Sequence, residues 1–579
     1  MPVLNFWDRV RSIFTRPTRN LESMLFSLGR RRTPGGQGVL PGGGQGVPPG
    51  GGPESARSEP IPTDIEAAFK LLAGRFHHPR SRDITIRRFL IGGSPSQRAF
   101  VVYYEGLADA KRIEREILTP LMRVSREKRV AAGRLPEHVL ETLLPAATAT
   151  STRAVEEVVG GVVLGDAAII LEGGHAIVVD VKNPPTRQPE EPITERVVRG
   201  PHMGFTESHR INTAMVRTFL HDPDLVSEQY TVGRRTMTPV SVMYISDIAN
   251  PRLVEEVGRR LRSLDVDSVL DSGTLEKLIE DHPVTFVPLV LSTERPDRTA
   301  FELLHGAVGI IAGNSPRSLI VPMNFATLLH TSEDVYIRWY YASFLRVIRV
   351  AAVVIALLLP AAYLAILNFH QEMIPEQLLV VFTVARASVP FPLIANILLM
   401  ELAFELIREA GLRLPSAVGP TIGIVGALLL GDMAVRSGLV TPSTVIAVSL
   451  TALASFSIPD PCTAFAVRVG RFVFIALAGL LGFYGMALGA FALMVHLAGL
   501  RSFGVPFLSP IGPWRPGSPD VILRGPTWTQ EMRPIQFRPL DLIRQARYAR
   551  AWDPGVPGET QAARPQSEGE DGQGKGGDA

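Results

Sequence analysis

The feature that most restricts how this chain can fold is the stretch Val389–Pro461, which is apolar enough for a lipid bilayer and yet carries carboxylates within its apolar segments. Glu401, Glu405 and Glu409 recur every four residues, and Asp432 follows in the next apolar segment. An ionisable side chain at membrane depth costs roughly 3 kcal/mol on insertion scales, so it normally lies against protein or water rather than lipid. This stretch is therefore the default place for a functional site.

The composition divides the chain into two halves. Charged residues are frequent up to about Trp339, whereas apolar runs dominate from Val350 to Val495, and the mean hydropathy is +0.17. The formal net charge is only +3, which gives no case for a nucleic-acid-binding surface. The single cysteine, Cys462, excludes an internal disulfide and a cysteine-based zinc site. We expect a multi-domain integral membrane protein: an N-terminal α/β region followed by an α-helical transmembrane bundle.

We expect no folded core in residues 1–62. A basic amphipathic start, MPVLNFWDRVRSIF, precedes a Gly/Pro-rich segment that lacks hydrophobic periodicity and is expected to be disordered. The start has no long apolar h-region, so we expect no secretory signal and a cytoplasmic N-terminal region. Two interpretations of the start remain open: a helix on an anionic membrane surface, or a frayed tail.

The next part of the chain alternates strand-like and helix-like runs and predicts two α/β subdomains, at 63–150 and 151–338. A glycine followed four and five residues later by isoleucines occurs twice, each time before an apolar strand: Gly165, Ile169 and Ile170, then Gly306, Ile310 and Ile311. The pattern indicates related hairpins, although chance similarity between hairpins explains it nearly as well.

This soluble half matches no catalytic motif. It has no G-x-x-x-x-G-K-[ST] phosphate loop, no G-x-S-x-G and no H-E-x-x-H. His77 and His78 are adjacent, which suits turn histidines better than two metal ligands on one helix face. Asp180 and Asp247 follow strand-like runs, where caps and turns explain them. We expect no enzyme activity, no catalytic or metal-ligating residues and no cofactor.

The apolar half predicts four to six membrane spans within a helical domain at 339–500. The run from Val350 to Leu367 contains no charge and is long enough to span. Residues 377–394 contain an arginine and two prolines and predict a broken or re-entrant segment. Further spans are expected at 418–435, 443–458 and 472–495. The positive-inside rule allows five spans with the tail outside, or an even number with a basic cytoplasmic tail at 501–579, which we favour.

The segment 418–435 best suits a pore lining. One predicted helix face repeats small residues suited to close helix packing: Gly419, Gly423, Ala427 and Gly431. The offset face carries the candidate pore-lining residues Thr421, Val425, Leu428 and Asp432. A symmetric bundle would place an apolar constriction between a polar and an acidic ring. The alternative is a tightly packed helix whose Asp432 reaches the interface.

The acidic face of Glu401, Glu405 and Glu409 also has two interpretations. It can be the water-facing stripe of an interfacial helix, with Arg408 and Arg413 as partial partners, and this is the one we favour. It can instead be a ring of carboxylates at the mouth of a cation pathway.

Several motifs together resemble a known family. The soluble half contains EEPITERVVRGPHMGF and VPLVLSTERPDR, and the apolar half contains FHQEMIP, PFP, ELAFELIREAGLRLP, IVGALLLGDMAV and RSFGVPFLSPIGP. Over roughly residues 63–515 the chain is similar to the A subunit of GerA-type spore germinant receptors. It departs from the family at residues 201–205, which read PHMGF where the family commonly reads PREGF.

The resemblance implies a nutrient-sensing protein of the spore inner membrane, acting with a transporter-like B subunit and a lipoprotein C subunit. It also implies a homo-oligomeric A subunit, embedded among membrane lipids, that conducts cations once nutrient binds and so triggers germination. Competing hypotheses are a non-conducting scaffold of the receptor, a stage V sporulation paralogue with an accessory role in ion release, and a secondary transporter, for which no inverted repeat is visible.

Overall fold

The computed structural model describes residues 59–93, 97–123, 139–140, 144, 148–183, 191–192, 195–413, 431–512 and 520–545. The basic start, nearly all of the Gly/Pro-rich segment and most of 418–435 lie outside the described residues.

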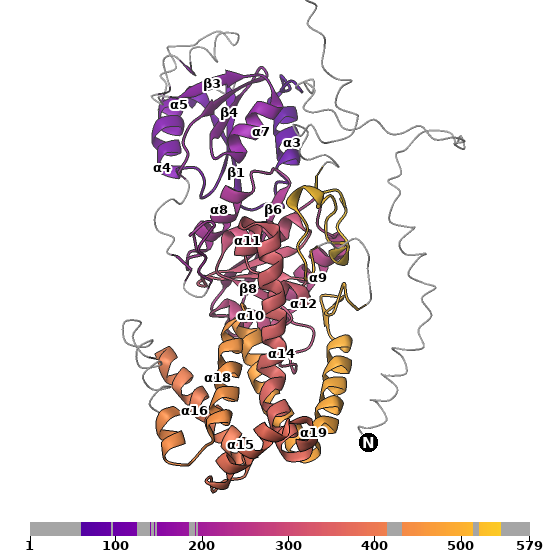
Figure 1. Ribbon diagram of the computed structural model, residues 1–579. Coiled ribbons are helices and arrows are strands. Elements are labelled where there is room, and N and C mark those ends of the chain that lie inside the picture. The colour runs from indigo at the N-terminus through magenta and orange to yellow at the C-terminus, as the bar shows by residue number, and fades with distance from the viewer. Residues whose placement is uncertain are drawn as a thin grey trace, which may run out of the picture. The chain divides into compact units, whose positions relative to one another are not determined.

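The first α/β subdomain, coloured indigo to purple in Figure 1, is an antiparallel sheet. Its strand order is β1-β2-β4-β5-β3. Its strands are β1 (Ile84–Leu90), β2 (Arg98–Tyr104), β3 (Ala149–Thr152), β4 (Ala167–Leu171) and β5 (His175–Val179). Helices α3 (Ile65–Arg75) and α7 (Val155–Val163) pack on one face. The other face is covered by α4 (Ala110–Arg112), the π-helical turn η2 (Ile113–Leu118) and α5 (Thr119–Arg123).

The predicted subdomain boundary at residue 150 is wrong. Strands β4 and β5 follow that boundary, yet β4 pairs with β2 and β5 pairs with β3. The valine-rich segment Val155–Val163 forms the helix α7. Its buried positions Val155, Val158 and Val162 follow helical spacing, so burial of one helix face outweighs the β-propensity of valine.

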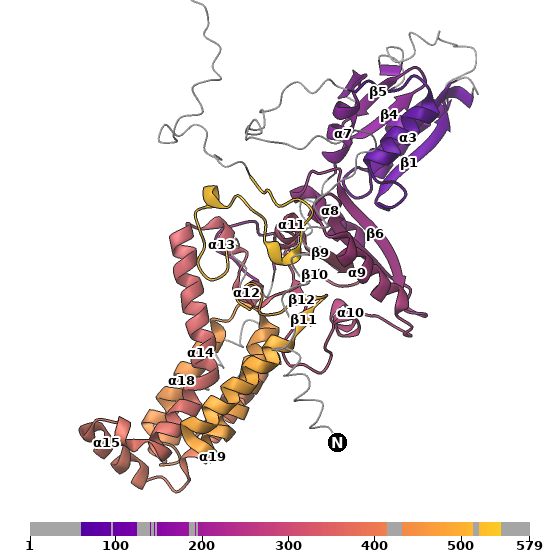
Figure 2. The same cartoon turned by 90° about the vertical axis from the view of Figure 1, so that its right-hand side faces the viewer.

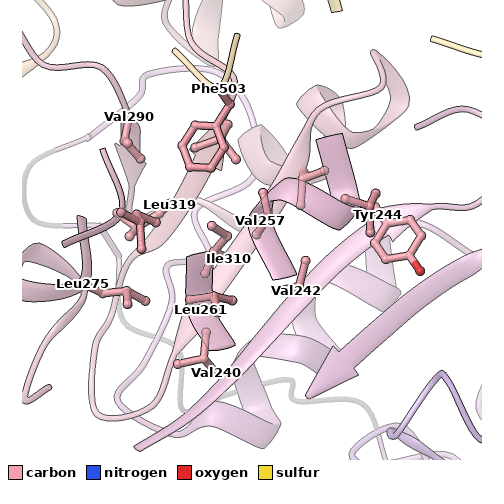
Figure 3. Close-up of a cluster of buried hydrophobic side chains, with 14 of the residues drawn as sticks. Val240, Val242, Tyr244, Val257, Leu261, Leu275, Val290, Ile310, Leu319 and Phe503 are labelled. Carbon is pink, nitrogen blue, oxygen red and sulfur yellow. The ribbon is translucent and has the colours of Figure 1, made fainter. Parts of the chain in front are cut away.

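The second α/β subdomain is an antiparallel sheet with the order β6-β7-β9-β10-β8. Its strands are β6 (Leu225–Val232), β7 (Thr238–Ile245), β8 (Leu291–Thr293), β9 (Val308–Ala312) and β10 (Ser318–Val321). Helices α9 (Pro251–Ser263) and α10 (Ser272–Ile279) cover the face shown in Figure 3, where Val257, Leu261 and Leu275 meet the strand residues. Helices α8 (His209–Phe219) and α11 (Pro296–Leu304) cover the other face.

The two sheets have the same topology when β1–β5 are matched in order with β6–β10. The matched helices α7 and α11 are followed by Gly165 (φ 100°) and Gly306 (φ 91°), and each glycine leads into a fully buried strand. The positive φ explains the glycines, because residues with a Cβ adopt it only at a cost. The predicted relation between the two hairpins is confirmed.

The helical region begins after the short helices α12 (Phe325–Leu329) and α13 (Glu333–Tyr336). It consists of α14 (Trp339–Phe369), α15 (Glu376–Ala387), α16 (Leu393–Arg413), α18 (Pro442–Phe456) and α19 (Pro461–Gly499). Helix α14 packs along α18 and α19, as Figure 2 shows. Among the described residues, α14 and α19 are long and apolar enough to cross a membrane when α19 is taken as one helix of 39 residues. The predicted break within 377–394 falls between α15 and α16.

The prediction of one span over 472–495 is wrong, because α19 reverses direction at Gly482 (φ 62°, ψ −141°). A methyl group on Gly489 would lie 2.7 Å from Leu477 Cδ1, whereas twelve residues of one straight helix would hold the two about 18 Å apart. Residues 461–481 and 483–499 therefore form a helical hairpin. The sequence did not indicate the turn, because residues 472–495 carry no charge and a glycine occurs both in packed helices and at reversals.

Gly482→Ala is expected to destabilise this hairpin. The backbone conformation is one that residues with a Cβ rarely adopt, and the added methyl would lie 3.0 Å from Phe369 Cβ. We expect a loss of about 1–3 kcal/mol, seen as a lower unfolding midpoint of the purified full chain. Gly499→Ala is the matched control, because a methyl there meets nothing within 4 Å. Equal midpoints for the two variants would contradict the reversal at Gly482.

The chain after α19 returns to the second α/β subdomain through β11 (Arg501–Ser502) and β12 (Val505–Pro506). Ser502 Oγ donates to the Leu289 carbonyl at 2.7 Å, and Leu540 N donates to the Ile248 carbonyl at 2.8 Å. The described part of the tail thus lies against the α/β region. An even number of membrane crossings would place the tail and the α/β region on the same side of the membrane, in agreement with these contacts.

Candidate functional site

Two of the three α16 carboxylates are paired with arginines from the first half of α19. Glu401 is 1% exposed, and its Oε2 lies 3.1 Å from Arg471 Nη1. Glu405 Oε1 lies 3.1 Å from Arg471 Nη2, and Glu405 Oε2 lies 3.2 Å from Arg468 Nη1. Arg471 is itself 1% exposed. A bidentate guanidinium between two carboxylates is a geometry that arginine provides and lysine does not.

Arg408 completes this ion-pair cluster, as the sequence predicted. Its Nη1 lies 3.7 Å from Glu405 Oε1, its Nη2 donates to Ser455 Oγ at 2.9 Å, and its guanidinium lies 4.8 Å from the centre of the Phe456 ring. Helices α16, α18 and α19 are thereby joined by one set of polar contacts.

The water-facing interpretation is wrong for Glu401, which faces neither water nor lipid, and Glu405 is only partly exposed. Their ion pairs also neutralise the charge that a cation pathway would use. Glu409, by contrast, is exposed, and the side chain of Arg413 lies outside the described residues.

The candidate pore helix is described only at its end. Asp432 Oδ2 lies 2.9 Å from Arg436 Nε in an exposed pair within one helical turn. Gly431 is buried, and a methyl there would lie 3.7 Å from Val445 Cγ1 of α18, in agreement with a packing role. The other six residues lie outside the described residues and stay predictions: Gly419, Thr421, Gly423, Val425, Ala427 and Leu428.

A second buried cluster, centred on Asp334 of α13, joins the α/β region to α14. Asp334 is fully buried, and its Oδ2 lies 3.0 Å from Arg346 Nε and 2.8 Å from Arg349 Nη1. Burial alone would raise the pKa of Asp334, but Arg349 and Arg346 outweigh it and lower the pKa to about 2. The carboxylate therefore stays charged at any physiological pH.

The tail reaches the same cluster. Arg346 also pairs with Asp520, and Arg524 Nη1 donates to the Asp334 carbonyl at 2.8 Å. Nearby, His330 Nε2 lies 2.7 Å from the Val521 carbonyl. Burial and the charge of Arg346 lower the pKa of His330 to about 4, so the ring is neutral near pH 7 and donates this bond. Sequence reasoning missed all of these contacts, since their partners are distant along the chain.

Comparison with known proteins gives one family. The family model described as "Bacillus/Clostridium GerA spore germination protein" matches residues 70–536. The chain is 39% identical to "Spore germination protein KA" of Bacillus subtilis (strain 168), over 81% of this chain and 86% of that protein. It is 37% identical to "Uncharacterized membrane protein YfkQ" of the same organism, over 78% of this chain and 87% of that protein.

Among solved structures, the chain is similar to the N-terminal domain of the A subunit of the Bacillus megaterium spore germinant receptor GerK3. The identity is 31%, the match covers 46% of this chain and 98% of that chain, and the TM-score is 0.36.

Proposed function

Because the chain belongs to the GerA spore germination protein family, we propose that it is a membrane-embedded subunit of a spore germinant receptor that conducts cations when nutrient binds. The match covers the α/β region, the helical region and the tail as far as residue 536. We therefore propose this role for the α/β region, the helical region and the tail acting together.

The outward surface of the helical region supports the proposal that this region lies in a membrane. Large apolar side chains are exposed along it, including Val354 on α14, Ile446 on α18 and Leu480 on α19 at 51%, 68% and 73%. A monomeric soluble protein rarely exposes a contiguous apolar surface of this kind. Trp339 and Tyr340 are exposed at the start of α14, where an aromatic belt at the membrane interface is typical.

The distribution of charge supports a cation route along 418–435 rather than along α16. Glu401 and Glu405 are neutralised by arginines, whereas within the described part of the chain Asp432 pairs only with Arg436, in an exposed position. Exposed pairs are weak and exchange readily with water, so Asp432 keeps a charge that a cation can use. In an oligomer this residue would form an acidic ring beyond an apolar constriction at Val425 and Leu428.

The proposal extends to location and partners. The α/β region and tail lie on the cytoplasmic side of the spore inner membrane, and copies of the chain assemble around a central pathway with transporter-like B and lipoprotein C subunits. The contacts between tail and α/β region support an even number of crossings. A non-conducting scaffold of the receptor remains the competing hypothesis.

Val425→Ala tests conduction, because a smaller side chain widens an apolar gate. We expect spores carrying the variant to release cations at lower nutrient concentration or without nutrient, at normal protein level. Leu430→Ala is the control, since it removes a larger group about 140° around the predicted helix from Val425. Unchanged ion release and germination in Val425→Ala would favour the scaffold.

A further inference from the structure

A cavity of about 470 Å³ lies where the second α/β subdomain meets the ends of α16, α18 and α19. The charged side chains that line it are Glu195, Arg196, Arg295, Arg298, Arg408 and Arg468. Cation conduction as proposed above assigns no role to this cavity.

The cavity carries an excess of positive charge. Arg295 is balanced by Asp297 at 2.9 Å and Arg298 by Glu195 at 3.6 Å. Arg408 and Arg468, however, share the single carboxylate of Glu405, which also pairs with Arg471. Arg196 is exposed and has no ion-pair partner among the described residues. An anion entering the cavity would therefore meet guanidinium groups that lack full compensation.

The cavity wall also holds a buried hydroxyl without a partner. Ser332 is 8% exposed, lines the cavity, and its Oγ makes no hydrogen bond to any described residue. A buried polar group left unpaired is unfavourable, and a ligand oxygen in the cavity would satisfy it. Guanidinium groups together with a hydroxyl donor are typical of phosphate recognition.

The rim of the cavity is apolar and belongs to the proposed membrane-facing surface. Phe456 lines the cavity and is 70% exposed, and Phe465 is 60% exposed with Arg468 over its ring. An anion that carries acyl chains could place its phosphate among the arginines and its chains against these rings. A free phosphate would use only the first of these features.

We infer that this cavity binds the phosphate of an anionic phospholipid, held by Arg196, Arg408 and Arg468, with Ser332 donating to a phosphate oxygen. A lipid bound there ties the cytoplasmic leaflet to both the α/β region and the helical region. The inference holds equally for a channel and for a scaffold, so its failure would leave the proposed conduction untouched.

The test is the unfolding midpoint of the purified full chain in detergent, titrated with phosphatidylglycerol, phosphatidylcholine or inorganic phosphate. We expect phosphatidylglycerol to raise the midpoint saturably by several degrees and phosphatidylcholine to do so far less. Arg196→Gln should weaken the apparent affinity about five- to tenfold. Arg199→Gln, an exposed arginine on the same segment that does not line the cavity, should bind as the wild type does.

Ser332→Ala gives an independent signature. It removes an unpaired hydroxyl, so the midpoint without lipid should be unchanged or higher, while the shift caused by phosphatidylglycerol should shrink. If inorganic phosphate also raises the midpoint and competes with phosphatidylglycerol, the phosphate site is supported and free phosphate is a second ligand of it. Equal shifts with both lipids, or unchanged phosphatidylglycerol binding in both Arg196→Gln and Ser332→Ala, would overturn the inference.

Discussion

Arg471→Met is expected to remove most of the folded protein from membranes. Methionine replaces the aliphatic stem of arginine but leaves the buried carboxylate of Glu401 without its guanidinium partner. Breaking a buried ion pair from one side costs about 3–5 kcal/mol, a large share of the roughly 5–15 kcal/mol that stabilises a typical fold. The measurement is the amount of full chain recovered as one species in detergent, together with its unfolding midpoint.

The double variant Glu401→Gln/Arg471→Met shows whether the loss comes from the unpaired charge. It removes both partners, while Glu405 keeps Arg408 and Arg468, so it should recover most of the lost stability. Arg436→Gln breaks the exposed pair with Asp432 and should cost less than about 1 kcal/mol. If Arg471→Met and Arg436→Gln have the same effect, the ion-pair cluster of α16 and α19 does not stabilise the fold as described.

Asp334→Asn is the second large effect we expect. The change keeps the side-chain size but leaves the guanidinium groups of Arg346 and Arg349 facing a neutral amide in a buried position. We expect a loss of about 3–5 kcal/mol and faster proteolysis of the tail, because Arg346, which the Asp334 carboxylate holds in place, also pairs with Asp520 of the tail. Limited proteolysis and the unfolding midpoint of the full chain measure the two effects. Glu333→Gln, next in sequence and without an ion pair among the described residues, is the control.

The pH dependence gives a further check on Asp334. Its pKa is lowered to about 2 in the folded chain, so its contribution to stability is complete above the ordinary aspartate range and is lost as the pH falls through 2. The stability difference between wild type and Asp334→Asn should thus stay constant from pH 8 to about 5. A difference that disappears within that range would show that Asp334 is not ionised among the arginines.

Some local features of the fold were predictable from the sequence. Gly165 and Gly306 each stand where a helix must turn into a buried strand, and the apolar runs after them specify the hairpins whatever their neighbours do. The start of the helical region at residue 339 was also predictable, because the long apolar run that follows it is a local feature of the sequence. The boundary at residue 150 failed because strand pairing is non-local, and the apolar pattern of β4 does not reveal that its partner is β2.

The candidate site was only half predictable. The spacing of Glu401 and Glu405 correctly gave a shared helix face, but the partners of that face come from a helix more than 60 residues later. One signal was available: Arg468 and Arg471 lie three residues apart at the edge of an apolar run, a spacing that complements the two glutamates. The sequence did not reveal the turn at Gly482, however, and so it could not show where α19 packs.

Thiol modification along 418–435 tests the proposed cation pathway most directly, and the chain suits it because Cys462 is its only cysteine. In a Cys462→Ser background, single cysteines replace the residues of the candidate pore face, Thr421, Val425, Leu428 and Asp432, or the off-face controls Gly426 and Leu430. The nutrient-triggered cation flux of vesicles holding the whole receptor is then measured with a charged thiol reagent. We expect block at the four pore-face positions and none at the two controls. Flux that is unaffected at all four, at normal protein level, or blocked equally in both sets, would contradict the proposal.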